Sequence, residues 1–130
     1  MDVQQWEEFL VGPGGGDGEL HVTLSRKGEI LVGARAFEKM GSPDAAVLLF
    51  DRVNSMIGLR PAHPKTPNSY PLKAKTNCRH RVVRASRFCR HHKIRVERTI
   101  AFNRPVVNGE GILVLDLKGA SGLGWMREEV

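Results

Sequence analysis

The chain has 130 residues, of which 41% are hydrophobic and 26% are charged, and this balance is typical of a soluble globular protein with one core. Two cysteines are too few for a disulfide framework and suit a reducing compartment. The sequence contains no run of about 18 apolar residues, the length that would predict a transmembrane helix. Its acidic N-terminus lacks the apolar stretch of a secretory signal. We therefore expect a cytoplasmic protein with no membrane partner.

The net charge of +6 is unevenly distributed along the chain. Residues 73–98 contain ten Lys or Arg and a single acidic residue, Glu97, whereas the rest of the chain has ten basic and thirteen acidic residues. The sequence thus places one basic segment on a nearly neutral body. Such a segment favours an acidic partner.

Both ends of the chain are expected to lie outside the folded domain. Residues 1–18 form an N-terminal arm in which the last seven residues include five glycines and one proline, the composition of a flexible linker. Residues 119–130 are glycine-rich at first and are predicted to form a flexible tail. The sequence predicts a single domain over residues 19–118.

The first half of this domain, residues 19–62, is predicted to fold as two strands, a short helix and two more strands. Leu20, Val22 and Leu24 alternate with polar residues, which indicates a half-buried strand. Gly41 is expected to end the helix as a left-handed residue. The predicted elements are strands 20–24 and 29–32, a helix over 34–40, and strands 46–50 and 55–60.

The second half, residues 78–118, follows a connector over residues 61–77 that contains four prolines and is predicted to be a linker or surface loop. The sequence predicts strands 81–84, 98–102 and 112–117, with a helix over 85–93. This order repeats that of the first half. Residues 33–37 align with 84–88, and Phe50 aligns with Phe102.

We therefore predict an α+β fold in which two similar β-α-β-β halves form small antiparallel sheets or a shared barrel-like core. Neither half, at about 40–50 residues, has enough interior to fold securely alone. The alternative is a mixed sheet without true duplication.

Residues 20–62 resemble the AbrB family of swapped-hairpin transition-state regulators and antitoxins. The resemblance rests on the glycine turn and apolar strand of 25–32, the short helix of 36–41 that closes in glycine, and the hairpin of 46–51 and 55–61. It implies the swapped-hairpin fold, DNA binding and a core built from two intertwined chains. A duplicated chain would intertwine within one molecule or still form a homodimer.

The chain departs from the family pattern at the helix. Gly33 stands where the family usually has proline, and Phe37 and Glu38 stand where it usually has arginines that reach DNA. The basic residues left near this element are Arg26, Lys27 and Arg35. The resemblance therefore supports the fold more than it supports DNA contacts in the first half.

The second predicted helix carries the main candidate binding residues. Ala85, Phe88, Cys89 and His92 are spaced as a core-facing stripe, which leaves arginines on the other side. A short helix of this kind can lie against a nucleic-acid backbone. The alternatives are a solvated basic surface and a site for an acidic protein partner. The candidate nucleic-acid contacts are Lys73, Lys75, Arg79, Arg81, Arg84, Arg87, Arg90 and Lys93.

Two identical Cys-Arg-His tripeptides, 78–80 and 89–91, raise the question of a zinc site. Cys89 and His91 would point in different directions on a helix, so a Cys₂His₂ set would need Cys78, His80, Cys89 and His92. The Cys-x-His spacing is shorter than that of common zinc motifs. The competing interpretation makes Cys89 a small core residue, and we expect no metal and no cofactor.

Catalytic motifs are missing from the sequence. It has no nucleophile-elbow, phosphate-loop or His-Glu-x-x-His pattern, and its carboxylates show no paired spacing. We therefore expect a non-enzymatic DNA-binding regulator or antitoxin-like protein. The alternative is an accessory module that binds an acidic protein partner, with or without a Cys/His zinc site.

Overall fold

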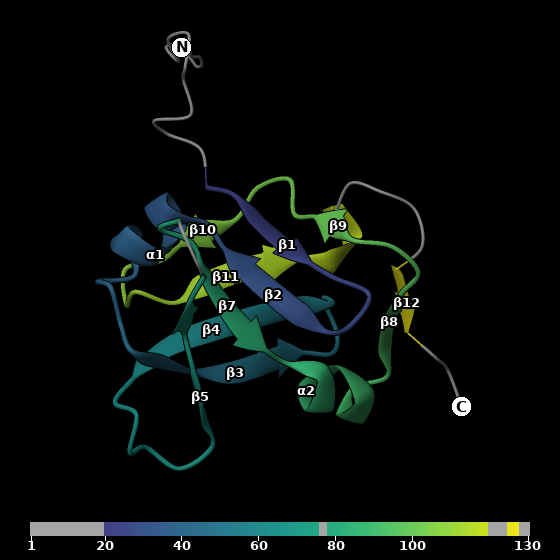
Figure 1. The fold of residues 1–130 in the computed structure, drawn as a ribbon. Helices are drawn as coiled ribbons and strands as arrows, with labels where there is room; N and C mark the ends of the chain where they lie inside the picture. The colour runs from purple at the N-terminus through teal and green to yellow at the C-terminus, as the bar shows by residue number, and fades with distance from the viewer. Residues whose placement is uncertain (1–19, 76–77, 120–124, 128–130) are drawn as a thin grey trace, which may run out of the picture.

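A computed structural model describes residues 20–75, 78–119 and 125–127 of the chain. The predicted N-terminal arm, residues 1–18, lies outside the described residues. Twelve strands, two α-helices and one 3-10 turn follow one another within this part of the chain (Figure 1). Their bounds are β1 Val22–Leu24, β2 Glu29–Val32, α1 Ala34–Lys39, β3 Ala45–Asp51, β4 Met56–Ala62, β5 Ser69–Pro71, β6 Lys73–Ala74, β7 Arg81–Arg84, α2 Ser86–His91, β8 Ile94–Val96, β9 Ile100–Ala101, β10 Val106–Val107, β11 Leu113–Asp116, η1 Leu117–Gly119 and β12 Trp125–Arg127.

The strands form two five-stranded antiparallel sheets. The first has the order β6-β7-β2-β1-β9 and the second the order β10-β11-β4-β3-β5, while β12 pairs with β8. At the centre of the first sheet Ile30 lies opposite Val83, and at the centre of the second Leu59 lies opposite Leu113. Each sheet has two edge strands, so the sheets do not close into a barrel. The predicted α+β class with small antiparallel sheets is confirmed.

One apolar core lies between the two sheets. Alternate residues of β1, β2 and β7 in the first sheet, and of β4 and β11 in the second, join a single buried cluster. Ile30, Ile57 and Leu115 are fully buried within it. No polar or charged residue is buried in the described part of the chain. Burial of apolar side chains from both halves therefore stabilises the fold, at roughly 25 cal/mol per Å² removed from water.

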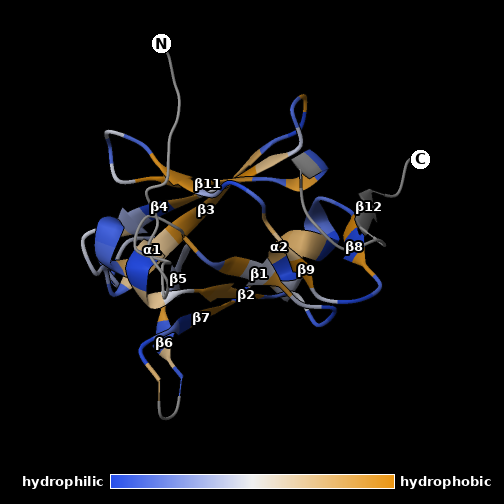
Figure 2. Cartoon of the chain, turned by 90° about the horizontal axis from the view of Figure 1, so that it is seen from above, coloured by the Kyte–Doolittle hydropathy of each residue, from blue (hydrophilic) through white to orange (hydrophobic). Residues whose placement is uncertain are grey.

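The two helices lie at opposite ends of the space between the sheets. Figure 1 and Figure 2 place α1 on one side and α2 on the other, each directly after a strand of the first sheet. Helix α1 buries Ala36 and Phe37 and ends before Gly41, whose φ of +94° agrees with the predicted left-handed position. Both helices have six residues, so neither has the length of a membrane-spanning helix.

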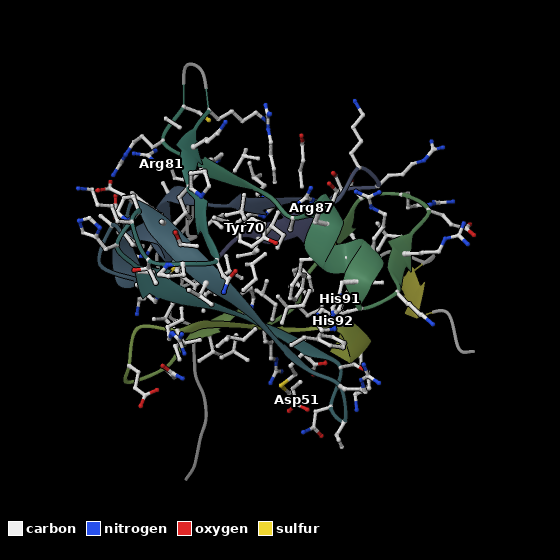
Figure 3. The ribbon with its side chains drawn as sticks, turned by 90° about the horizontal axis from the view of Figure 1, so that it is seen from below. Asp51, Tyr70, Arg81, Arg87, His91 and His92 are labelled. Carbon is white, nitrogen blue, oxygen red and sulfur yellow. The ribbon has the colours of Figure 1, made fainter. Side chains whose placement is uncertain are left out.

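The prediction of a linker over residues 61–77 is wrong for much of this segment. Strand β4 continues to Ala62, β5 pairs with β3, and β6 pairs with β7. Leu72 is buried, and Tyr70 is half-buried against the core, where Figure 3 shows it in the middle of the molecule. Proline is tolerated here because β5 is an edge strand, where an N–H is not needed for pairing.

The predicted flexible tail also differs from the structure at one place. Residues 125–127 form β12, which pairs with β8 so that Trp125 lies opposite Val96. Residues 120–124 and 128–130 of the predicted tail lie outside the described part of the chain.

The strand order relates the two halves in a way that differs from the sequence alignment. Each sheet has a central pair with one strand from each half, β2 with β7 and β4 with β11. By their positions in the two sheets, β1, β2, β3 and β4 correspond to β6, β7, β10 and β11, and α1 corresponds to α2. Strands β8 and β9 lie between α2 and β10 in the chain and are outside this correspondence. In this match β10 takes the place of β3, whereas β9, which precedes Phe102, pairs with β1. The alignment of Phe50 with Phe102 is thus not supported by the topology.

Candidate functional site

Helix α2 has the orientation that its sequence predicts. Ala85, Phe88 and Cys89 are buried and His92 is half-buried, whereas Arg87 is exposed. The Phe88 ring lies 6.2 Å from the Phe50 ring and 4.7 Å from the His92 ring, both edge-on. Figure 3 shows Arg87 at the start of the helix and His91 and His92 at its end, with Asp51 below them at the end of β3. The aromatic contacts fix the helix and leave its basic side chains outward.

The turn between β1 and β2 packs against the start of α2. The Ala85 N–H donates a hydrogen bond to the Gly28 carbonyl at 2.8 Å. A Cβ added at Gly28 would lie 2.6 Å from the Ser86 Cα, so this approach requires glycine. Within the turn, the Ser25 hydroxyl oxygen accepts hydrogen bonds from the Lys27 and Glu29 N–H groups, each at 3.2 Å. The backbone that carries Arg26 and Lys27 is therefore held beside α2.

A cavity of about 310 Å³ lies between this turn, α2 and β8. Four basic side chains line it: Arg26 and Lys27 from the turn, Arg90 from α2 and Arg95 from β8. Within the described part of the chain, no carboxylate lines the cavity. The site thus combines basic residues that are about 65 positions apart in the sequence.

The apolar side of the cavity is formed by Leu24, Cys89 and Ile94, all of them buried. Burial raises the pKa of the Cys89 thiol to about 11, because the thiolate would lose its hydration. Cys89 is therefore a neutral thiol at physiological pH and adds no negative charge to the cavity. It also lacks the lowered pKa that a nucleophilic cysteine needs.

The eight predicted nucleic-acid contacts do not form one cluster. Arg84, Arg87, Arg90 and Lys93 are exposed on and beside α2, and we call these four residues the α2 basic surface. The other four candidates, Lys73, Lys75, Arg79 and Arg81, lie before β7 or at its first residue. Arg79 and Arg81 contact α1 and not α2. The predicted set therefore divides between the two ends of the fold.

Several residues of the second group have structural roles. Arg79 forms an ion pair with Glu38 of α1, and the Arg81 guanidinium lies 4.3 Å from the centre of the Phe37 ring. Lys73 pairs with Val82 across β6 and β7, and the Lys75 N–H donates to the His80 carbonyl. The exposed pair of Arg79 and Glu38 contributes little stability, but it directs Arg79 toward α1 and away from α2.

The four candidate zinc ligands do not come together. His80 Nδ1 accepts a hydrogen bond from the Ala34 N–H at 3.0 Å, so His80 lies at the start of α1. Cys78 is exposed in the segment before β7, whereas Cys89 is buried on α2 and His92, directly after α2, is half-buried against Phe88. No group of three or more metal-binding side chains occurs among the described residues. The Cys₂His₂ hypothesis is therefore wrong for this arrangement.

The sequence did not predict that Arg26 and Lys27 lie beside α2, although Gly28 gave a partial signal by marking a tight turn.

The fold and the site define a small α+β protein with a basic cavity beside a short helix. Comparisons with protein-family models, curated proteins and solved structures gave no match for this chain.

Proposed function

We propose that the protein is a non-enzymatic DNA-binding regulator or antitoxin-like protein that contacts DNA through the α2 basic surface and the adjoining turn. The observation that carries this proposal is the convergence of basic side chains from three separate elements around α2. Phosphate contacts by Arg and Lys supply most of the affinity of such proteins, independent of sequence.

Two further features support a phosphate-binding surface. Arg84, Arg87 and Arg90 are exposed, and the core contacts of Phe88 keep the helix that carries them in place. Glu29 lies opposite Arg84 in the register of the first sheet, so one carboxylate is set against the four basic residues of this surface. The surface therefore keeps a net positive charge.

The topological match of the two halves supports an internal duplication of the AbrB-like unit. In that proposal the strands β2 and β7, and likewise β4 and β11, take the positions that the AbrB resemblance assigns to two intertwined chains. One chain then supplies the whole core, and a homodimer would add a second DNA-binding surface rather than complete the fold.

The proposal predicts a specific change in salt dependence. We expect the binding constant for duplex DNA to fall with salt, with a log–log slope near −0.9 per neutralised phosphate. Replacing Arg84 and Arg87 together with alanine should reduce that slope by roughly two units and weaken binding to all sequences alike. Fluorescence anisotropy of labelled duplex DNA across a salt series measures both effects.

A variant with the same loss of charge elsewhere serves as the control. Arg60 and Lys65 are exposed, on β4 and in the loop after it, and the double alanine variant should leave the slope nearly unchanged. If both double variants reduce the salt slope equally, net charge and not this surface determines DNA binding. If the unmodified chain shows no binding at low salt, the DNA proposal fails and an acidic protein becomes the leading partner.

A further inference from the structure

We propose that the cavity between the β1–β2 turn, α2 and β8 binds the terminal phosphate of a nucleotide-sized ligand. This inference concerns a phosphomonoester in a recessed site and goes beyond the phosphodiester contacts proposed for the α2 basic surface. The ligand is either a free mononucleotide or the 5′-phosphorylated end of a nucleic-acid strand. The shared chemistry is a phosphate dianion attached to a compact organic group.

The charges around the cavity select an anion. Arg26, Lys27 and Arg90 come from two elements that face each other across it. In the described residues, every ionisable side chain that lines the cavity is basic apart from the neutral Cys89 thiol. Arginine binds phosphate oxygens in pairs of charge-assisted hydrogen bonds, which makes these side chains suited to a phosphate.

The small volume of the cavity favours a compact ligand or the end of a strand. A volume of about 310 Å³ is at the lower limit of small-molecule sites, which span roughly 300–1,000 Å³. Leu24 and Ile94 line the cavity but are almost fully buried, so a ligand would contact mainly the exposed basic side chains around it. A continuous diester backbone would instead need a groove that is open at both ends.

Hydrogen bonds also hold the backbone of the site in shape before any ligand binds. The Gly28 N–H donates to the Ser25 carbonyl at 2.9 Å, and the Gly28 carbonyl accepts from the Ala85 N–H. The first bond closes the turn, and the second connects the turn to the start of α2 across nearly 60 residues of sequence. A preformed site avoids the ordering cost that weakens binding by mobile loops.

The test compares nucleotides with and without the phosphate. We expect adenosine 5′-monophosphate to bind the full chain in isothermal titration calorimetry and adenosine to bind at least about tenfold more weakly, the effect of losing a charged hydrogen bond. An oligonucleotide with a 5′-phosphate, compared with the same strand ending in a 5′-hydroxyl, distinguishes the strand end from the free nucleotide as the source of the phosphate.

Two matched double variants locate the binding. Replacing Arg26 and Arg90 with glutamine should weaken adenosine 5′-monophosphate binding at least about tenfold. Replacing Arg84 and Arg87 with glutamine removes the same charge outside the cavity lining and should change it less than about threefold. All four side chains are exposed, so thermal melts should show both variants folded.

The inference is overturned if the nucleotide and the nucleoside bind equally, if neither binds, or if the two double variants lose affinity equally. Duplex DNA without terminal phosphates is titrated in parallel. If the chain binds duplex DNA but does not prefer the nucleotide to the nucleoside, only the proposal for the cavity is rejected. If it prefers the nucleotide but does not bind duplex DNA, only the proposed function is rejected.

Discussion

Phe88→Ala is expected to lower the free energy of unfolding by about 3–5 kcal/mol, because truncating a buried aromatic side chain removes its contacts and leaves a cavity. Phe88 is 7% exposed and meets the rings of Phe50 and His92 edge-on. The loss is a large part of the 5–15 kcal/mol typical of whole domains. Urea denaturation should measure it, and thermal melts should shift down by at least about 10 °C.

The control for this prediction is an exposed apolar residue. Val53 is 86% exposed in the turn after β3, and Val53→Ala should change stability by less than about 0.5 kcal/mol. The affinity of the folded fraction of Phe88→Ala for DNA should equal that of the unmodified chain. A loss of stability below about 1 kcal/mol would mean that Phe88 does not hold α2 in place.

Gly28→Ala should lower the free energy of unfolding by roughly 2–5 kcal/mol, since two separate costs act at this position. Its φ of +82° is strained for alanine, and the new Cβ would lie 2.6 Å from the Ser86 backbone. The strain contributes about 1–2 kcal/mol and the overpacking about 1–3 kcal/mol. Urea denaturation measures the sum.

Three other glycines separate these two costs. Gly41→Ala introduces the positive-φ strain without a neighbour within 4 Å, whereas Gly33→Ala places a Cβ 2.6 Å from the His21 carbonyl oxygen without that strain. Each should therefore cost less than Gly28→Ala. Gly109→Ala meets neither condition and should be nearly neutral. If Gly28→Ala were no worse than Gly41→Ala, the close packing of the turn on α2 would be wrong.

Elements with a clear local signal were predictable from the sequence. The strand β2 and the helices α1 and α2 agree with their predicted positions within two residues, because apolar spacing and Gly41 mark them locally. The core-facing stripe of α2 was predictable for the same reason.

The missed elements depend on contacts far apart in the sequence. Strands β5, β6, β8 and β10 have two or three residues, which is too short for a periodic pattern, and they exist because a neighbouring strand pairs with them. Pro71 in β5 also suggested a loop, although an edge strand tolerates it.

The candidate site was predictable only in part. The charge run from residue 73 to 98 indicated a basic region, but not that Arg79 and Arg81 contact Glu38 and Phe37 of α1. It also gave no sign that Arg26 and Lys27 complete the site, because their position depends on the packing of the β1–β2 turn against α2.

Amide chemical-shift mapping of the isotope-labelled full chain with short duplex DNA at low salt tests the proposed binding surface most directly. We predict that the largest shifts occur at residues 25–28, 84–91 and 94–96. Shifts centred instead on the apolar hollow of about 190 Å³ lined by Leu49 and Val114, or no shifts at all, would contradict the proposal that the basic surface around α2 binds DNA.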